Sequence, residues 1–112
     1  MEDNHIVDSL IIELRRGTQI MIVLNALKKE AYGYQLLQTL NDLGVNIEAG
    51  TLYPLLRRLE NQGLLESTWD TSESRPRKFY QLSDLGFEVL DQLKEAWLLI
   101  HEEMAILFKE NK

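Results

Sequence analysis

The stretch that decides the fold runs from Gly50 to Gly63 and reads GTLYPLLRRLENQG. Its leucines recur at helical spacing and form one inner stripe, made of Leu52, Leu55, Leu56 and Leu59. Gly63 stands where a residue of positive φ would end such a helix. Pro54 lacks a backbone N–H, so it fits best near the first turn. Two N-caps remain open: Thr51 puts Pro54 at the third helical position, whereas Asn46 requires a kink at Pro54.

A shorter helix is predicted just before this stretch, starting at Tyr32-Gly33-Tyr34. Its expected buried face consists of Leu36, Leu37, Leu40 and Leu43. Gly44 is placed to end it in the left-handed conformation. Two short helices joined by a tight glycine-containing turn are typical of a helix-turn-helix.

Two strand-like segments follow the second helix. Residues 64–69 are partly alternating, residues 78–82 are again strand-like, and the segment 70–76 between them is polar and turn-rich. This pattern predicts a β-hairpin with a long tip. A helix-turn-helix followed by such a hairpin is a winged helix, so the fold class is mainly α with a small β-hairpin.

A long helix is predicted from Ser83, which caps it, to the end of the chain, with Asp84 in its first turn. Its apolar residues recur at close to 3.5-residue spacing from Phe87 onward. Such a helix is roughly 35–40 Å long, more than a domain of this size can cover, so a second copy of the chain is expected to cover it. The dimerisation residues predicted on it are Leu90, Leu93, Trp97, Ile100, Met104, Leu107 and Phe108.

The N-terminal segment has helical apolar spacing over residues 6–14, and residues 20–27 are apolar nearly all round, as expected of a core helix. Gly17-Thr18 lies between them, and one kinked helix or two helices fit this pattern equally well. The resulting division is a winged helix-turn-helix over residues 1–82 and a dimerisation helix over residues 83–112.

Composition excludes several function classes. The 112 residues include no cysteine, so disulfides and thiolate metal sites are excluded, and no apolar run approaches a membrane span. The acidic N-terminus lacks the features of a signal peptide, so the cytoplasm is the expected location. No nucleophile motif, phosphate loop or zinc-binding histidine pair occurs, so no catalytic residue, metal or cofactor is predicted.

The net charge of −6 argues against DNA as a partner until the chain is divided. Residues 46–78 carry five basic and five acidic side chains, whereas the acidic excess lies at the two ends. Within this neutral middle, Arg57-Arg58 and the run from Arg75 to Lys78 form two local basic clusters. Local charge therefore restores the DNA-binding interpretation.

Three segments of the chain resemble the PadR family of transcriptional regulators: Gly33 to Leu37, Gly50 to Glu66, and Arg75 to Gly86. The resemblance covers about residues 14–97, with Phe79 where the family usually has tyrosine and Ser83 where threonine is common. The short C-terminal region resembles the compact branch that has one long C-terminal helix. The resemblance implies a winged-helix homodimer that binds a pseudo-palindromic operator, usually as a repressor, and that in some members is released by a small aromatic or drug-like molecule.

Eight residues are predicted to contact DNA. Base edges are expected to meet the N-terminal half of the second helix of a helix-turn-helix, where Thr51, Tyr53 and Arg57 lie. Tyr34 and Gln35 open the preceding helix, whose free N–H groups suit a phosphate. The wing is expected to reach phosphate or the minor groove, through Arg75, Arg77 and Lys78.

Trp97 has two interpretations. It is either a core residue of the dimer or one wall of an apolar cleft between protomers that accepts a flat aromatic ligand. Two rivals to the regulator interpretation also remain: a winged helix used for protein contacts, and a binder of apolar molecules with DNA secondary. The basic wing favours DNA, whereas Trp97 alone does not exclude the second rival.

Overall fold

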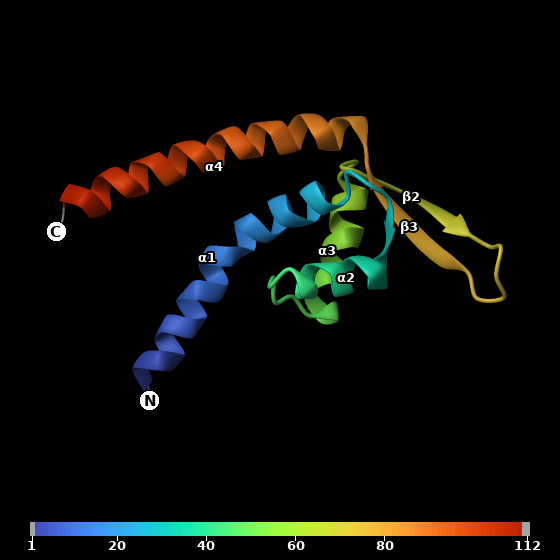
Figure 1. Cartoon of the computed structure of the whole chain (residues 1–112), viewed down its shortest axis with the longest axis horizontal. Coiled ribbons are helices and arrows are strands. Elements are labelled where there is room, and N and C mark those ends of the chain that lie inside the picture. Colours follow the sequence, from blue (N-terminus) through green and yellow to red (C-terminus); the bar gives the residue numbers. More distant parts are fainter. Residues whose placement is uncertain (1, 111–112) are drawn as a thin grey trace.

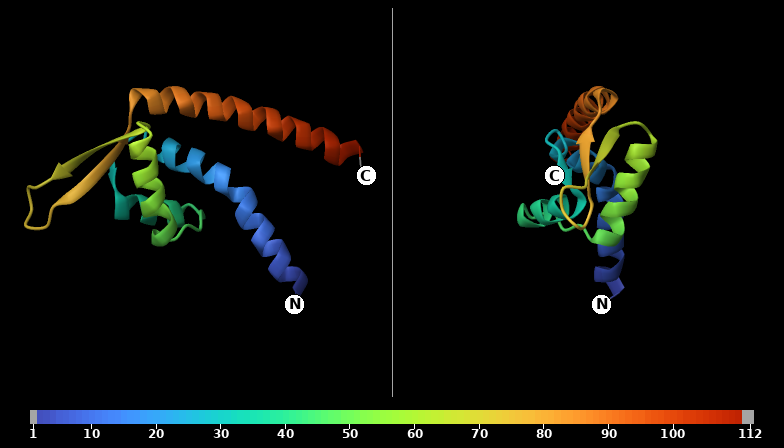
Figure 2. Two further views of the ribbon diagram at one scale, coloured as in Figure 1. Left: turned by 180° about the vertical axis from the view of Figure 1, so that it is seen from behind. Right: turned by 90° about the vertical axis from the view of Figure 1, so that its right-hand side faces the viewer.

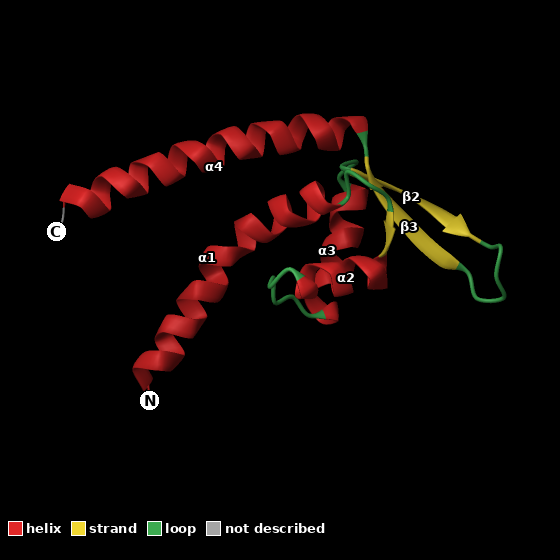
Figure 3. Ribbon diagram, in the orientation of Figure 1, coloured by secondary structure: helices red, strands yellow, loops and turns green. Residues whose placement is uncertain are grey.

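The computed structural model describes residues 2–110 and shows a winged helix-turn-helix with a long helix at each end of the chain (Figure 1, Figure 3). The helices are α1 (Glu2–Ala26), α2 (Gly33–Asp42), α3 (Ala49–Asn61) and α4 (Asp84–Glu110). The strands are β1 (Ala31–Tyr32), β2 (Leu65–Asp70) and β3 (Arg77–Leu82). The predicted fold class is confirmed, with one short strand in addition to the hairpin.

The molecule is elongated, with principal extents of 59 × 37 × 23 Å. We call α2, α3 and the three strands the head, and β2, β3 and the loop between them the wing. Figure 2 shows α1 and α4 leaving the head on the side opposite the wing and diverging toward their free ends. None of the helices in residues 2–110 has the length and apolarity needed to cross a membrane.

The core lies where α1, the head and the beginning of α4 meet. Its buried apolar residues come from every one of these parts: Val23, Leu24, Leu27, Leu36, Leu40, Ile47, Leu52, Leu56, Leu59, Leu65, Tyr80, Leu82 and Leu90. The leucine stripe of α3 is therefore buried as predicted, apart from the half-buried Leu55. In α2 the stripe ends early, because Leu43 is 74% exposed and was wrongly assigned to the core.

Both helices of the helix-turn-helix end at a glycine in the left-handed region, with φ +90° at Gly44 and +81° at Gly63. In each case two backbone bonds close the end. Val45 N–H donates to Leu40 O at 2.9 Å and Gly44 N–H to Asn41 O at 3.0 Å, and the same pattern repeats after α3. These are Schellman motifs, which other residues disfavour because their Cβ crowds the backbone at positive φ.

The beginning of α3 differs from both predicted alternatives. The N-cap is Glu48, without a side-chain cap, so neither Thr51 nor Asn46 holds that position. Ile47 and Leu52, the two positions of a hydrophobic staple, are both buried in the core and fix the entry of the chain. Pro54 consequently lies inside the helix, where both Pro54 and the residue whose carbonyl loses its donor, Gly50, are exposed to water.

The sheet is antiparallel, in the order β1-β3-β2. The predicted hairpin pairs Leu65 with Leu82 at its base and Asp70 with Arg77 at its tip. Strand β1 was missed, because Tyr32 was placed at the beginning of α2 whereas it pairs with Phe79. A two-residue strand carries no alternating pattern that a sequence could reveal.

The N-terminal segment is one bent helix (Figure 1). Gly17 and Thr18 lie inside it, and the Thr18 hydroxyl donates to Arg15 O at 3.0 Å. A glycine beside a threonine that bonds back to the preceding turn is a known cause of helix bending. The open choice between one kinked helix and two is thereby settled in favour of one.

Ser83 begins α4 as predicted. Its hydroxyl accepts from Gly86 N–H at 2.9 Å and donates to Gly63 O at 2.6 Å. Gly86 packs so closely that an added Cβ would lie 2.2 Å from Leu64 O. The helix therefore approaches the α3–β2 turn to a distance that only glycine permits at residue 86.

We expect Gly86→Ala to lower the free energy of unfolding by about 1–3 kcal/mol, because its methyl group would overlap backbone that cannot move aside. Gly17→Ala is the matched control. An added Cβ there meets no atom within 4 Å, so the gain in helix propensity should leave stability equal or higher. Urea unfolding of the variants at one protein concentration measures both effects. A Gly86→Ala variant as stable as the wild type would contradict the close approach.

Candidate nucleic-acid interface

The beginning of α2, the middle of α3 and the strands of the wing line one hollow of about 270 Å³. Its lining is aromatic and basic: Tyr32, Gly33, Tyr34, Tyr53, Trp69, Arg77, Lys78 and Tyr80. Four of the eight predicted DNA contacts lie in this lining. The three elements predicted to contact DNA therefore converge on one surface of the head.

The beginning of α2 presents Tyr34 and Gln35, both exposed. The Gln35 side-chain oxygen accepts from Tyr32 N–H at 3.3 Å, which closes the first turn of the helix. With the oxygen used in this way, the amide N–H groups of Gln35 are the donors that remain for a phosphate. The geometry is compatible with the predicted contact and adds a capping role that the sequence did not reveal.

Helix α3 exposes Thr51 and Arg57, whereas Tyr53 is half-buried. The ring of Tyr53 packs against Gly33, where an added Cβ would lie 2.7 Å from its Cε1 atom. Gly33 thus leaves room for the Tyr53 ring between α2 and α3. Tyr53 fills the seam between the two helices, and its predicted contact with base edges stays a prediction.

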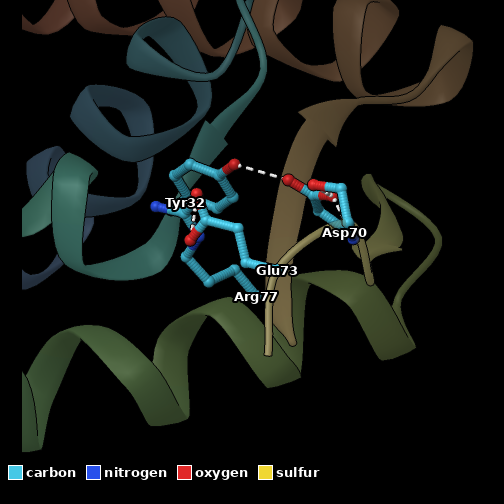
Figure 4. Close-up of polar contacts among 5 residues, drawn as sticks. Tyr32, Asp70, Glu73 and Arg77 are labelled. Atoms are coloured by element: carbon cyan, nitrogen blue, oxygen red, sulfur yellow. Dashed lines mark hydrogen bonds and ion pairs between the residues drawn. The ribbon is translucent and has the colours of Figure 1, made fainter. Parts of the chain in front are cut away.

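Arg77 is held by its neighbours in the wing (Figure 4). Its guanidinium forms an ion pair with Glu73, Nη2 to Oε2 3.2 Å, and lies 4.2 Å from the centre of the Tyr32 ring. The Tyr32 ring also stacks on Phe79, with 3.9 Å between ring centres. The predicted phosphate ligand Arg77 is therefore already paired within the protein.

Asp70 connects the wing to β1. The Tyr32 hydroxyl donates to its Oδ2 at 2.9 Å, and Ser72 donates to Oδ1 through its hydroxyl and its backbone N–H. These bonds, those from Ser72 above all, lower the pKa of Asp70 to about 2. The pKa of Tyr32 is raised by burial and by its bond to Asp70. The loop of the wing is thus fixed at its base.

Lys78 lies in β3 and is occupied by a different partner. Its Nζ forms an ion pair with Glu60 Oε1 at 3.0 Å, and the Ser67 hydroxyl donates to the other oxygen of Glu60. The bond to Glu60 raises the pKa of Lys78, and the bonds from Ser67 and Lys78 lower that of Glu60. This cluster joins the end of α3 to both strands of the wing, and the phosphate contact of Lys78 stays a prediction.

Arg75 and Trp69 complete this surface. Arg75 is exposed on the loop of the wing, so of the three predicted basic contacts it is the most open to solvent. Trp69 is 62% exposed on β2, opposite Lys78 in register. It was not among the predicted contacts, although a large aromatic residue in a strand beside a basic loop was a signal that could have been used.

Comparison with known proteins identifies the chain. Residues 23–92 match the model of the transcriptional regulator PadR-like family. The chain belongs to the PadR family. The crystal structure of a PadR family transcriptional regulator from Eggerthella lenta is 48% identical, with a TM-score of 0.91 over 96% of both chains. A PadR-like transcription factor from Bacteroides fragilis is 32% identical, with a TM-score of 0.76 over 88% of this chain and 98% of its own.

A curated relative agrees with this assignment. Transcriptional regulator Rv3488 of Mycobacterium tuberculosis is 34% identical over 73% of this chain and 77% of its own length. As a member of the PadR family, the chain is a DNA-binding transcriptional regulator and not an enzyme. PadR regulators bind DNA, typically as dimers. Among the described residues no group of three or more acidic or histidine side chains is placed to hold a metal ion.

The outer part of α4 carries the apolar stripe that this PadR-family chain was predicted to use for dimerisation. Its exposed members are Trp97, Ile100, Met104, Leu107 and Phe108, and Leu93 is half-buried. Leu90 is a correction, because it is 1% exposed and packs in the core of its own protomer. The seven-residue pattern continues through Leu90, but the first turns of α4 lie on the head.

The outer part of α1 carries a second exposed apolar face, which was not assigned to dimerisation from the sequence. Its members are Ile6, Val7, Leu10, Ile11 and Leu14, each at least 43% exposed. The sequence indicated one face of a helix over this segment but assigned it no partner; only residues 20–27 were expected in the core, where Val23, Leu24 and Leu27 are buried. The face stays exposed because α1 bends and its first half runs away from the head (Figure 1).

Trp97 lines a groove of about 320 Å³ between α1 and α4. The lining is predominantly apolar: Leu14, Gly17, Thr18, Met21, Leu93, Ala96, Trp97 and Ile100. The indole ring stacks on His101, with 5.2 Å between ring centres and 13° between planes. Trp97 is thus 41% exposed in the described protomer and forms part of a groove wall.

We expect Asp70→Asn to reduce the loss of stability in acid. The pKa of Asp70 is about 2 in the folded chain against an ordinary value of 3.8, so between these pH values the unfolded chain binds more protons. Its contribution to stability is therefore present above about pH 4 and is lost as the pH falls toward 2. Urea midpoints measured from pH 5 to pH 2.5 should fall less steeply in the variant.

Asp42→Asn, on the exposed end of α2, controls for the loss of one negative charge. Equal slopes for the wild type and Asp70→Asn would show that the bonds from Ser72 and Tyr32 do not stabilise the folded wing.

Proposed function

We propose that this chain is a transcriptional repressor that binds a pseudo-palindromic operator as a homodimer. The observation that carries the proposal is the convergence of the beginning of α2, α3 and the wing on one aromatic and basic surface. In this arrangement α3 enters the major groove, with Thr51 and Arg57 toward base edges. Tyr34 and Gln35 take one flanking phosphate, and Arg75 and Arg77 follow the DNA backbone from the wing.

The exposed apolar faces of α1 and α4 support the homodimer. Each face is long and would be costly to leave in water. Residues 83–112 then serve mainly for dimerisation and residues 1–82 for DNA binding, with Leu90 belonging to the core of the latter. A two-fold axis through this interface presents two copies of α3 to half-sites about one helical turn apart.

The charge distribution supports the same orientation. The chain has a net charge of −6, but residues 79–112 carry seven of its 18 acidic side chains and only three basic ones. In the proposed complex the acidic α4 faces away from DNA, so its repulsion disfavours other docking orientations. DNA as the partner also places the protein in the cytoplasm.

The groove at Trp97 supports an effector as a second element of the proposal. Its volume of about 320 Å³ lies within the range of small-molecule pockets, and its walls are apolar except for Thr18. A flat aromatic molecule would stack on Trp97 and separate α1 from α4. Because it would bind one dimer geometry better than another, it would shift operator affinity by that difference.

We expect specific, salt-sensitive binding to the DNA upstream of the gene that encodes this protein. Fluorescence anisotropy of that labelled DNA, with unrelated DNA as control, should show a preference of about a thousandfold. The logarithm of affinity should fall linearly with the logarithm of salt concentration. Arg57→Gln should reduce the preference, whereas Gln62→Ala, beyond the end of α3, should not.

Equal and weak binding to both DNAs would lead to a selection among genomic fragments. Recovery of one preferred fragment would place the operator elsewhere. No preferred fragment would contradict the proposal and favour a winged helix that serves protein contacts or apolar ligands.

We expect a planar cationic or phenolic compound to quench the emission of Trp97 and to release DNA at the same concentration. The titration uses a Trp69→Phe background, since Trp69 also emits and lies on the DNA surface. A Trp97→Phe variant that retains Trp69 should show no such change. If no compound of a broad panel quenches Trp97, the effector element of the proposal fails, while DNA binding stands.

A further inference from the structure

A second hollow, of about 400 Å³, lies between α1 and α3, and half of its lining residues are apolar: Gly17, Ile20, Pro54 and Leu55. Its polar lining comes from both helices: Arg16 and Gln19 from α1, and Thr51 and Arg58 from α3. It is distinct from the aromatic hollow beside the wing and from the groove at Trp97, since it shares with them only Gly17. The predicted DNA contacts include one residue of this lining, Thr51.

The lining is suited to an anion. It presents two guanidinium groups, a hydroxyl and an amide, and no carboxylate, although the chain has 18 acidic residues. The ion pairs found in the part of the chain that the structure describes join Arg77 to Glu73 and Lys78 to Glu60, so neither Arg16 nor Arg58 is neutralised within the described protomer. Arginine pairs on separate elements recognise phosphate well, because each presents a planar fork of donors.

We infer that this hollow binds a phosphate of the operator backbone through Arg16 and Arg58, which makes α1 part of the DNA interface. The inference rests on the proposed function. Along α3, Thr51 and Arg58 lie seven residues apart and so share one face of the helix. Arg57 lies about 100° around the helix from Arg58. With α3 in the major groove, Arg57 points toward base edges and Arg58 toward one flanking strand, where Arg16 approaches from α1.

This site also connects DNA to the groove at Trp97. Leu14, Gly17 and Thr18 of α1 line that groove, whereas Arg16 and Gln19, in the same turns of the helix, line the anion hollow. A molecule that pushes α1 away from α4 therefore moves Arg16 relative to Arg58. The phosphate contact is the point at which a displacement of α1 changes DNA affinity.

The experiment compares Arg16→Gln and Arg58→Gln with Arg15→Gln, the matched control. Arg15 is exposed, carries the same charge and lies one residue away, but it lines a different surface, near Asn46. Affinity for a labelled operator duplex, or for a random duplex at low salt, is measured against salt concentration. Because a dimer has two copies of the site, Arg16→Gln and Arg58→Gln should each lower the salt slope by about two and the affinity by roughly ten- to hundredfold.

A second measurement locates the contact. Operator duplexes with one uncharged methylphosphonate at each backbone position in turn should include one position per half-site that weakens the wild type. That position should have no further effect on Arg16→Gln or Arg58→Gln, and its full effect on Arg15→Gln. This pattern is the mark of one shared contact.

Other outcomes overturn the inference without touching the proposed function. Equal losses in all three variants would show a diffuse electrostatic effect with no phosphate site. Weaker dimerisation of Arg16→Gln without DNA, measured by sedimentation, would show that a carboxylate of the second copy fills the hollow. A wild type that prefers no DNA fragment would instead contradict the proposed function. The affinities of the three variants for a random duplex would still test the phosphate site.

Discussion

The arrangement of the whole chain depends on one buried junction around the Ser83 hydroxyl. That hydroxyl donates to Gly63 O, at the end of α3, and accepts from Gly86 N–H, in the first turn of α4, while Ser83 N–H donates to Leu64 O. Three bonds from one residue thus join the helix proposed to read DNA to the helix proposed to form the dimer. With Gly86 packed directly on this turn, α4 has little freedom to pivot on the head. In the proposed dimer, the spacing of the two copies of α3 therefore follows from how α1 and α4 pack.

The three basic residues of the wing differ in what DNA would have to displace. Lys78 and Glu60 are each about three-quarters buried and share a cluster with Ser67. If Lys78 left Glu60 to bind a phosphate, the Glu60 carboxylate would stay between α3 and the wing as a largely buried, unpaired charge. Arg77 is paired with Glu73, whose side chain is 65% exposed, and an exposed pair of this kind contributes little to stability. A phosphate can replace Glu73 at small cost, and the Tyr32 ring keeps the guanidinium in place meanwhile. Lys78 is therefore held in its pair with Glu60, whereas Arg77 can exchange Glu73 for a phosphate.

The sequence predicted two kinds of feature: those with a periodic residue pattern, and those that only one residue type permits. The leucine stripe of α3, the two positive-φ glycines and the Ser83 cap were all readable, because periodicity and steric limits act locally. The beginning of α3 was not, since Ile47 and Leu52 fix it through burial and no polar cap marks it. Strand β1 is too short for a pattern, and the pairing of Glu60 with Lys78 joins residues 18 apart that only the hairpin brings together. The position of Arg16 and Arg58 in one hollow could not be predicted either, because it depends on the path of α1 past α3.

Helix α1 is fixed to the head over only part of its length, so its first half is free to change direction. Its second half is fixed in the core by Val23 and Leu24, whereas its first half projects from the head with an uncovered apolar face. Gly17 lies between the two halves, and a Cβ added there would meet no atom within 4 Å apart from the helix's own backbone. A helix that is anchored at one end and bent at a glycine can take up two arrangements with little loss of packing, which is what coupling between two sites requires. Because the turns around Gly17 line both the groove at Trp97 and the hollow between α1 and α3, a change of bend alters both sites at once.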